Sequence, residues 1–247
     1  MTTNLQGRRA LVTGASRGIG AAIVRRLAAD GAADAFTYGK SAEEAEKLSA
    51  EVAADGGTAI AIQADSADAE QVARSIDDAV AQLGGLDILV NNAGIAVLGD
   101  VETFAGADFD QLVAVNIRAV FIAVQRALPH LGEGGRIINI GSINAERVPV
   151  SGLSVYSMTK GAVAGLTRGL ARDLGPRGIT VNNVQPGPVA TDMNPDTGDF
   201  AQEMKNVMAV GHYGQPQDIA SAVSYLAGPE ASYVTGANWN VDGGFTV

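Results

Sequence analysis

Apolar positions along the chain alternate between two spacings. Short apolar runs such as Ala10–Val12 suit buried strands, whereas Ile23, Val24 and Leu27 recur at helical spacing. These spacings predict strands at residues 8–13, 33–38, 58–63, 86–91, 135–141, 179–185 and 238–241. They predict helices at residues 18–30, 41–55, 67–83, 107–129, 155–175 and 215–227.

Strands that alternate with helix-length connections form a parallel sheet with helices on both faces. The expected fold class is therefore α/β, with a doubly wound parallel sheet of about seven strands, and a length of 247 residues suits one domain spanning 1–247. Residues 190–214 are irregular and contain Pro, Gly, Asp and Met. A loop this long is usually functional, so we expect a lid over a substrate, with a short helix near 200–209.

The composition excludes several classes of function. The chain has no cysteine, which excludes disulfides and thiolate metal sites and makes the cytoplasm the expected location. Its formal charge of −10 argues against nucleic acid as a partner. No apolar run reaches the length of a signal core or a membrane span, so no membrane partner is expected. His130 and His212 lie far apart and outside any ligand pattern, so no metal is expected.

A glycine-rich segment, TGASRGIG at residues 13–20, lies between the first predicted strand and the first predicted helix. Glycines let the backbone turn tightly and approach a pyrophosphate, and the following helix N-terminus offers free N–H groups to it. The spacing G-x-x-x-G-x-G differs from the common G-x-G-x-x-G fingerprint. A purely structural turn therefore stays an alternative at this stage.

Two further predicted strands end in short polar or turn segments. NNAG at residues 91–94 follows the apolar residues 88–90, and Pro186–Gly187 follows residues 179–185. The carboxyl ends of parallel strands meet at one edge of a sheet, which is where α/β folds bind ligands. An ordinary Asn-Gly-type turn is the alternative for residues 91–94.

The most informative set is Ser142, Tyr156 and Lys160. Residues four apart share a helix face, so Lys160 lies beside Tyr156 if this segment is helical. The ammonium group favours the phenolate form of a phenol, which is otherwise a weak acid. The Ser142 hydroxyl can hold a substrate oxygen while Tyr156 moves a proton to or from it. A surface tyrosine packed on a lysine stem is the alternative for this spacing alone.

With these motifs in this order, the chain resembles the short-chain dehydrogenase/reductases over essentially its whole length. The resemblance implies a Rossmann fold with strand order 3-2-1-4-5-6-7 and a nicotinamide-dependent oxidoreductase. It implies the catalytic residues Asn116, Ser142, Tyr156 and Lys160, with Asn116 on a water-linked proton path to the lysine. It also implies cofactor contacts from Gly14, Ser16, Arg17, Gly18, Ile19, Gly20, Tyr38, Lys40, Ser41, Asp65, Ser66, Asn92, Ala93, Gly94, Tyr156, Lys160, Pro186, Gly187, Val189 and Thr191.

Three positions depart from the family pattern. Asp34 occupies a place in the second strand where the family usually carries an apolar residue. Ala209 and His212 stand where relatives often show Pro and Arg. None of the three belongs to the catalytic set.

The end of the second strand indicates which cofactor is used. A protein that selects NAD often carries a carboxylate there, but this chain has Tyr38, followed by Lys40 and Ser41. No acid repels a 2′-phosphate, and Arg17 and Lys40 can bind it electrostatically. We therefore expect NADP(H), with two merely solvated surface cations as the alternative.

The expected activity is that of an NADPH-dependent carbonyl reductase, or alcohol dehydrogenase in reverse, on a small to medium ketone or aldehyde. The expected substrate pocket contains Ile95, Ile143, Asn144, Val150, Leu153, Met193, Met204 and Met208.

Two alternatives remain. One is 3-oxoacyl-carrier-protein reductase, although Glu133 replaces a basic docking residue and only Arg177 is retained. The other is a biofilm-dispersal subgroup said to bind cyclic-di-GMP, which the segments INAERVPVSGL and VQPGPVATD resemble.

We also expect a homotetramer, which is common in the family. Val115, Val120, Ile122 and Val124 are expected to leave helix 107–129 apolar over much of its surface. The C-terminal residues 238–245 are expected to present further large apolar groups to a neighbouring subunit.

Overall fold

The computed structural model describes residues 5–247, so the first four residues of the predicted domain lie outside it. The described residues form a seven-stranded parallel sheet whose order, β3-β2-β1-β4-β5-β6-β7, confirms the predicted one. The strands are β1 (Arg9–Val12), β2 (Ala33–Tyr38), β3 (Thr58–Gln63), β4 (Ile88–Asn91), β5 (Arg136–Ile140), β6 (Thr180–Pro186) and β7 (Asn238–Val241).

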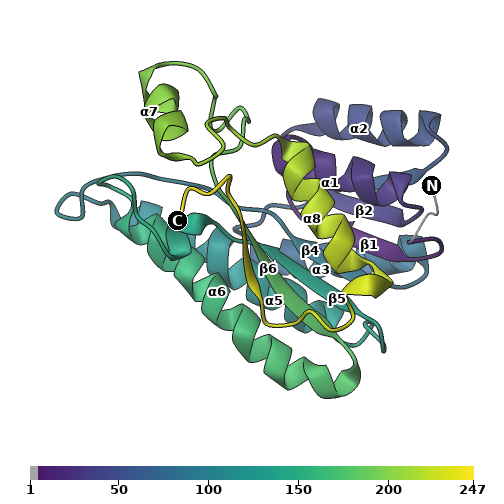
Figure 1. Cartoon of the computed structure of the whole chain (residues 1–247). Helices are drawn as coiled ribbons and strands as arrows, with labels where there is room; N and C mark the ends of the chain where they lie inside the picture. Colours follow the sequence, from purple (N-terminus) through teal and green to yellow (C-terminus); the bar gives the residue numbers. More distant parts are fainter. Residues whose placement is uncertain (1–4) are drawn as a thin grey trace.

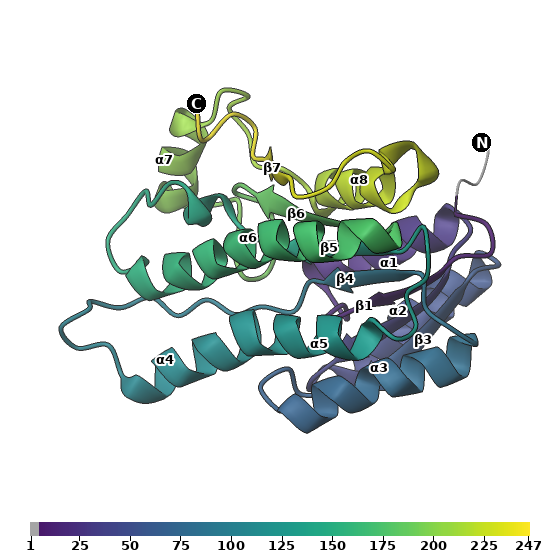
Figure 2. The same ribbon diagram turned by 90° about the horizontal axis from the view of Figure 1, so that it is seen from below.

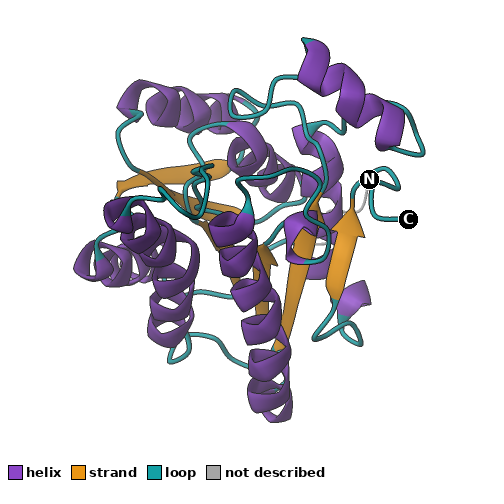
Figure 3. Ribbon diagram, turned by 90° about the vertical axis from the view of Figure 1, so that its left-hand side faces the viewer, coloured by secondary structure: helices purple, strands orange, loops and turns teal. Residues whose placement is uncertain are grey.

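Helices cover both faces of this sheet. The α-helices are α1 (Gly18–Ala29), α2 (Ala42–Ala54), α3 (Ala69–Leu83), α4 (Gly106–Val113), α5 (Ala119–Ala127), α6 (Ser154–Leu174), α7 (Asp199–Val207) and α8 (Pro216–Ala227). Helices α1, α2 and α8 lie on one face of the sheet, and helices α3, α5 and α6 lie on the other (Figure 1). Figure 3 shows the strands in orange between the helices in purple. Among residues 5–247, single 3-10 turns lie at Ile143–Ala145, Gly175–Arg177 and Pro229–Ala231. Within residues 5–247, none of the helices combines the length and apolar character that a membrane span requires.

The central strands are buried on both faces, which explains their nearly continuous apolar sequence. In β1, Val12 packs in the same core as Leu27 of α1, whereas Leu11 faces the opposite core with Ile76 of α3. Strands β1 to β6 each contribute side chains to both cores.

The predicted helix 107–129 is interrupted in the structure. Between α4 and α5 the chain forms a π-helical turn at Ala114–Arg118, which contains Asn116. Apolar spacing could not reveal this break, because Val115 and Val120 are both buried and continue the pattern through it. Single π-helical turns are frequent at functional sites.

The segment 190–214 contains α7, close to the short helix predicted near 200–209. Figure 2 shows α7, the start of α6 and the C-terminal end of the chain at the same end of the molecule. Strands β5 and β6 also lead into this end, through Ser142 and Gly187 respectively. The predicted catalytic and cofactor segments are thus gathered at the carboxyl edge of the sheet.

Candidate active site

The glycine turn after β1 packs directly against the end of β4. A Cβ atom on Gly14 would lie 2.8 Å from the Cα of Ala93. A Cβ atom on Gly20 would lie 2.6 Å from both the Cα of Ala15 and the Nδ2 of Asn92. Only glycine fits at these two positions, because real Cβ atoms do not approach other atoms so closely. The turn is therefore a tight cradle in front of α1.

Hydrogen bonds fix this cradle to neighbouring strands. The Thr13 Oγ1 accepts from the backbone N–H groups of Asn92 and Ala93, each at 3.0 Å. The Asn92 Nδ2 donates to the carbonyl oxygens of Thr13 and Gly14, each at 2.9 Å. The Gly14 N–H donates to the Thr37 Oγ1 at 2.8 Å. Strands β1, β2 and β4 thereby hold the turn in one position.

The start of α1 can bind an anion. Arg17, the residue just before the helix, makes no side-chain capping bond, and no acidic residue lies in the first turn of α1. Free N–H groups and the positive end of the helix dipole favour a phosphate there. The cradle and the helix start therefore fit the pyrophosphate of a dinucleotide.

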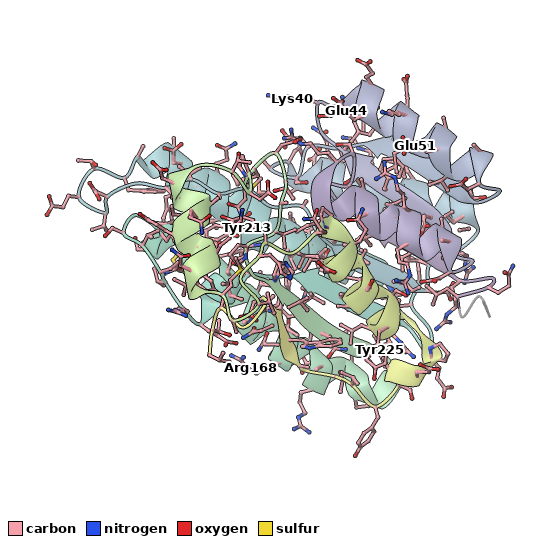
Figure 4. All side chains as sticks on the ribbon, turned by 45° about the horizontal axis from the view of Figure 1, so that its top comes forward. Lys40, Glu44, Glu51, Arg168, Tyr213 and Tyr225 are labelled. Carbon is pink, nitrogen blue, oxygen red and sulfur yellow. The ribbon has the colours of Figure 1, made fainter. Side chains whose placement is uncertain are left out.

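The predicted adenosine contacts lie around the ends of β2 and β3. Tyr38 ends β2 and is half-buried, and Lys40 is exposed at the surface near the start of α2 (Figure 4). Asp65 accepts from the N–H of Ala67 through Oδ1 at 2.9 Å. Ser66 helps line a small cavity that also reaches Thr13 and Ala93.

Helix α6 carries Tyr156 and Lys160 on one face, as their spacing predicted. The Lys160 Nζ lies 5.6 Å from the centroid of the Tyr156 ring. It donates a hydrogen bond to the carbonyl oxygen of Ile140, the last residue of β5, at 3.1 Å. Two residues further on, the Ser142 Oγ accepts from the Asn144 N–H at 3.1 Å and opens a 3-10 turn. The structure thus brings the ends of β5 and α6 together.

Asn116 joins the same group through the π-helical turn. Its Oδ1 accepts from the Ile95 N–H and its Nδ2 donates to the Ile95 carbonyl oxygen, each at 2.9 Å. Its Nδ2 also donates to the Thr159 Oγ1 at 3.1 Å. A Cβ atom on Gly94 would lie 3.6 Å from both the Asn116 Oδ1 and the Lys160 Nζ. Asn116 and Lys160 therefore flank Gly94, directly after β4.

The segment after β6 leads back to the glycine turn. The Gly187 N–H donates to the Val241 carbonyl oxygen at 3.0 Å, and buried Val189 pairs with Gly214. Thr191 then reaches the cradle, since its Cγ2 would lie 3.6 Å from a Cβ atom on Gly18. Of the predicted contacts after Pro186, Thr191 thus lies beside the proposed pyrophosphate site.

The predicted pocket residues fall into two groups. Ile95, Asn144 and Val150 are half-buried, Leu153 is buried and Met193 is exposed. Ile143, Met204 and Met208 are buried in one apolar cluster with Ala201, Tyr213 and Phe245. Met204 and Met208 belong to segment 190–214 itself and pack it onto Ile143 and Phe245, and the contact of this group with substrate stays a prediction.

Segment 190–214 is held by local contacts around Tyr213, which lies beside α7 (Figure 4). The Lys205 Nζ donates to the Asp196 carbonyl oxygen at 2.7 Å and lies 5.7 Å from the centroid of the Tyr213 ring. Burial, and to a lesser degree the Asp196 carboxylate, raise the pKa of the Tyr213 phenol. The phenol is therefore neutral near pH 7.

Three sets of contacts near the site had no signal in the sequence. Arg17 in the glycine turn lies 3.6 Å from the carboxylate of Asp192 in segment 190–214. Gln185 bonds both Glu146 and Asn240. Arg147 bonds the carbonyl oxygen of Phe245. These partners lie far apart in sequence, so no local motif could indicate them.

Comparison with known proteins identifies the family. A family model described as Enoyl-(Acyl carrier protein) reductase matches residues 14–246. The cyclic-di-GMP-binding biofilm dispersal mediator protein of Escherichia coli is 48% identical over 239 residues, which cover 97% of each chain. A short-chain dehydrogenase/reductase from Serratia marcescens is 58% identical, with a TM-score of 0.97 over 99% of this chain and 100% of that one. A short chain dehydrogenase from Burkholderia cenocepacia, solved in complex with NADP, is 53% identical, with a TM-score of 0.97 and the same coverage. The chain belongs to the short-chain dehydrogenase/reductase family of oxidoreductases.

Proposed function

We propose that this protein is an NADPH-dependent carbonyl reductase, or alcohol dehydrogenase in reverse, for small to medium ketones or aldehydes. One observation carries the proposal. Asn116 and Lys160 flank Gly94, next to the glycine cradle, and Lys160 shares a helix face with Tyr156. A cytoplasmic location and a single domain over residues 1–247 are part of the same proposal.

The proposed chemistry assigns one role to each side chain. NADPH supplies a hydride when it is bound, and negative charge then develops on the carbonyl oxygen of the substrate. The Tyr156 hydroxyl donates a proton to that oxygen and the Ser142 hydroxyl donates a hydrogen bond to it. The Lys160 ammonium favours proton loss from Tyr156 and then gives a proton back to the phenolate, and Asn116 is on the path that returns a proton to the lysine.

NADP(H) is the proposed cofactor because of the charged side chains at the part of the site that would hold the adenosine of the cofactor. Tyr38 leaves no carboxylate at the end of β2, while Arg17 and Lys40 supply two cations. Arginine binds phosphate well because its fork of N–H donors matches the oxygens. The NADP complex of the Burkholderia relative supports this assignment.

Segment 190–214 is the proposed lid. Thr191 lies against the glycine turn, and α7 follows within the same segment. Closure of such a segment excludes water from a hydride path and completes the pocket.

A Tyr156→Phe variant tests the proposal. We expect turnover to fall by about 100-fold or more, because the change removes the proton donor and keeps the ring. NADPH oxidation would be followed across a panel of ketones, aldehydes and acyl thioesters, and NADPH binding would be titrated separately. Tyr233→Phe is the matched control, because Tyr233 is fully exposed at 100%. Turnover of Tyr156→Phe within a few-fold of wild type would contradict the assigned role.

Cyclic-di-GMP binding is a second candidate, favoured by the Escherichia coli relative. The charges of the lid oppose it, because Asp192, Asp199 and Glu203 are exposed there. The lid cation Lys205 already donates to a backbone carbonyl. A doubly charged anion would therefore meet net negative charge on this side.

Reduction of 3-oxoacyl groups on a carrier protein is the remaining alternative. An acidic carrier needs exposed basic residues. Glu133 occupies one of the two expected positions, and Arg177 donates to the carbonyl oxygens of Leu128 and Leu131. Free small ketones and aldehydes are therefore the better proposal.

A homotetramer is part of the proposal, but its surface differs from the predicted one. Val115, Val120 and Val124 are buried inside the subunit, so they cannot form an interface. Phe245 is buried as well. The exposed aromatic side chains in these two regions are Phe109 and Phe121 of helix 107–129 and Trp239 of residues 238–245. Exposed aromatic groups of this size are typical of contact surfaces.

A further inference from the structure

Three side chains from distant parts of the sequence form a closed set of hydrogen bonds near the Ser142 turn. Gln185 of β6 is fully buried, and its Nε2 donates to the Glu146 Oε1 at 2.8 Å and to the Asn240 Oδ1 at 2.6 Å. The Asn240 Nδ2 donates to the Glu146 Oε2 at 3.1 Å. Both carboxylate oxygens of Glu146 are thereby tied, one to β6 and one to β7.

The next residue is also held by the C-terminal end of the chain. Arg147 donates from Nη1 to the carbonyl oxygen of Phe245, and its guanidinium carbon lies 4.9 Å from the centroid of the Phe245 ring. A guanidinium at this distance from a ring gains a cation–π attraction. Two consecutive residues after the Ser142 turn are therefore bound to residues 238–246, which we name the C-terminal segment.

Backbone hydrogen bonds carry this restraint to Ser142. The N–H groups of Glu146 and Arg147 each donate to the Ile143 carbonyl oxygen at 2.9 Å. The Ala145 N–H donates to the Ser142 carbonyl oxygen at 3.0 Å. A shift of Glu146 therefore moves the short turn that begins at Ser142.

The C-terminal segment also contacts the proposed lid. The Val210 N–H donates to the Gly243 carbonyl oxygen at 3.1 Å. Phe245 lies in one buried cluster with Met204 and Met208 of the lid and with Ile143 of the Ser142 turn. The C-terminal segment thus touches both the turn and the lid.

We propose that Glu146 is a positioning residue, which fixes the Ser142 turn to the C-terminal segment through Gln185 and Asn240. This inference rests on the proposed carbonyl reduction. A hydrogen-bond donor stabilises developing charge best when it is held in place beforehand. Without the hydrogen bonds of Glu146, the turn that begins at Ser142 is held less firmly and the Ser142 hydroxyl is less well positioned. The glycine cradle is unchanged. The expected consequence is a lower kcat with unchanged NADPH binding.

The kinetic test is a double-mutant cycle between Glu146 and Ser142. We expect Glu146→Ala to lower kcat by about 10-fold, because small misplacement of a reacting group costs this much or more. In a Ser142→Ala background, Glu146→Ala should have little further effect, since the group it positions is gone. Glu230→Ala, on the exposed 3-10 turn before β7, is the matched control. Wild-type kcat in Glu146→Ala, or a full further 10-fold loss in the double variant, would overturn the inference.

A second variant tests the same link without altering the turn or relying on turnover. Asn240→Ala removes the hydrogen bonds that join β7 to Gln185 and Glu146. Amide hydrogen exchange reports local opening of the backbone directly. We expect faster exchange at residues 143–147 in Asn240→Ala than in Glu230→Ala. Unchanged exchange there would overturn the inference even if no carbonyl substrate were turned over. Absence of wild-type turnover across the carbonyl panel would instead reject the proposed function.

Discussion

Asp34 is a buried carboxyl group without a partner, and its replacement should stabilise the protein. It lies in β2 between Ala10 of β1 and Ala59 of β3, on the face that carries Phe36. Its side chain is fully buried, and neither carboxylate oxygen has a hydrogen-bond partner among the described residues. Burial raises the pKa of Asp34 well above its usual range. We expect Asp34→Val to raise Tm, because valine suits both the strand and its apolar surroundings.

The expected gain has two parts. A buried polar group without a partner costs about 1–3 kcal/mol even when it is neutral. The second part depends on pH, because the folded protein keeps a proton that the unfolded chain releases. Between the unfolded pKa, about 3.9, and the raised folded pKa, stability of the wild type therefore falls as pH rises, by up to about 1.4 kcal/mol per pH unit. Above the folded pKa this loss stops growing.

Thermal unfolding at two pH values separates these parts. For a chain of this length about 1 kcal/mol corresponds to roughly 2–4 °C in Tm. We expect Asp34→Val to melt several degrees above wild type at about pH 4, close to the unfolded pKa, and the gap to widen at a higher pH at which Asp34 stays protonated in the folded protein. Protein concentration must be equal throughout, because assembly also shifts Tm.

Asp34→Asn is the matched control for charge. It keeps the shape and the unpaired polar atoms but cannot titrate. We expect its Tm to lie between those of wild type and Asp34→Val, with a gap to the valine variant that does not change with pH. The reasoning is wrong if Asp34→Val melts below wild type at both pH values. It is also wrong if the gap between valine and wild type is constant with pH.

The remaining predictions concern ligands and assembly. Arg17→Ala and Lys40→Ala should each weaken the kcat/KM preference for NADPH over NADH by about 10-fold or more, since a charge-assisted contact contributes about 1.5–3 kcal/mol; ratios that favour NADH in the wild type would refute the assignment. High salt should reduce the same preference. Light scattering at micromolar concentration should give a tetramer mass, and a monomer mass would contradict this. Calorimetry should show NADPH binding and no comparably tight binding of cyclic-di-GMP, whereas submicromolar affinity without carbonyl turnover would reverse the ranking of the two functions.

The sequence could predict the elements that have a local cause. Strand and helix periods follow from which faces are buried, so the predicted strands differ from the observed ones by two residues at most. Ser142, Tyr156 and Lys160 could be recognised because their residue types and spacing suit proton transfer. The structure brings the last two together on α6 and joins Lys160 to the end of β5.

The sequence could not predict features whose cause lies in distant partners. The π-helical turn holds Asn116 against Ile95, 21 residues away. The exposure of Val115, Val120 and Val124 was predicted wrongly, because apolar periodicity does not distinguish a helix face that packs on its own sheet from one that packs on another subunit. Glu146 and Asn240 are 94 residues apart. Neither has a residue type that is informative without its partner.

Polar side chains also hold the sheet together beneath the site. Asn91, Asn139, Asn183 and Asn238 lie in register on β4, β5, β6 and β7. The Asn91 Nδ2 donates to the Asn139 Oδ1, and the Asn183 Nδ2 donates to the Asn238 Oδ1, each at 2.8 Å. Burying such amides is unfavourable unless they are bonded, so these two bonds favour the observed register, although the Oδ1 atoms of Asn91 and Asn183 have no partner among the described residues. Because Ser142 follows β5 and Gly187 follows β6, fixing that register also fixes where these two loops begin. A site that must place a proton donor in advance of charge development benefits from a sheet edge that cannot slide.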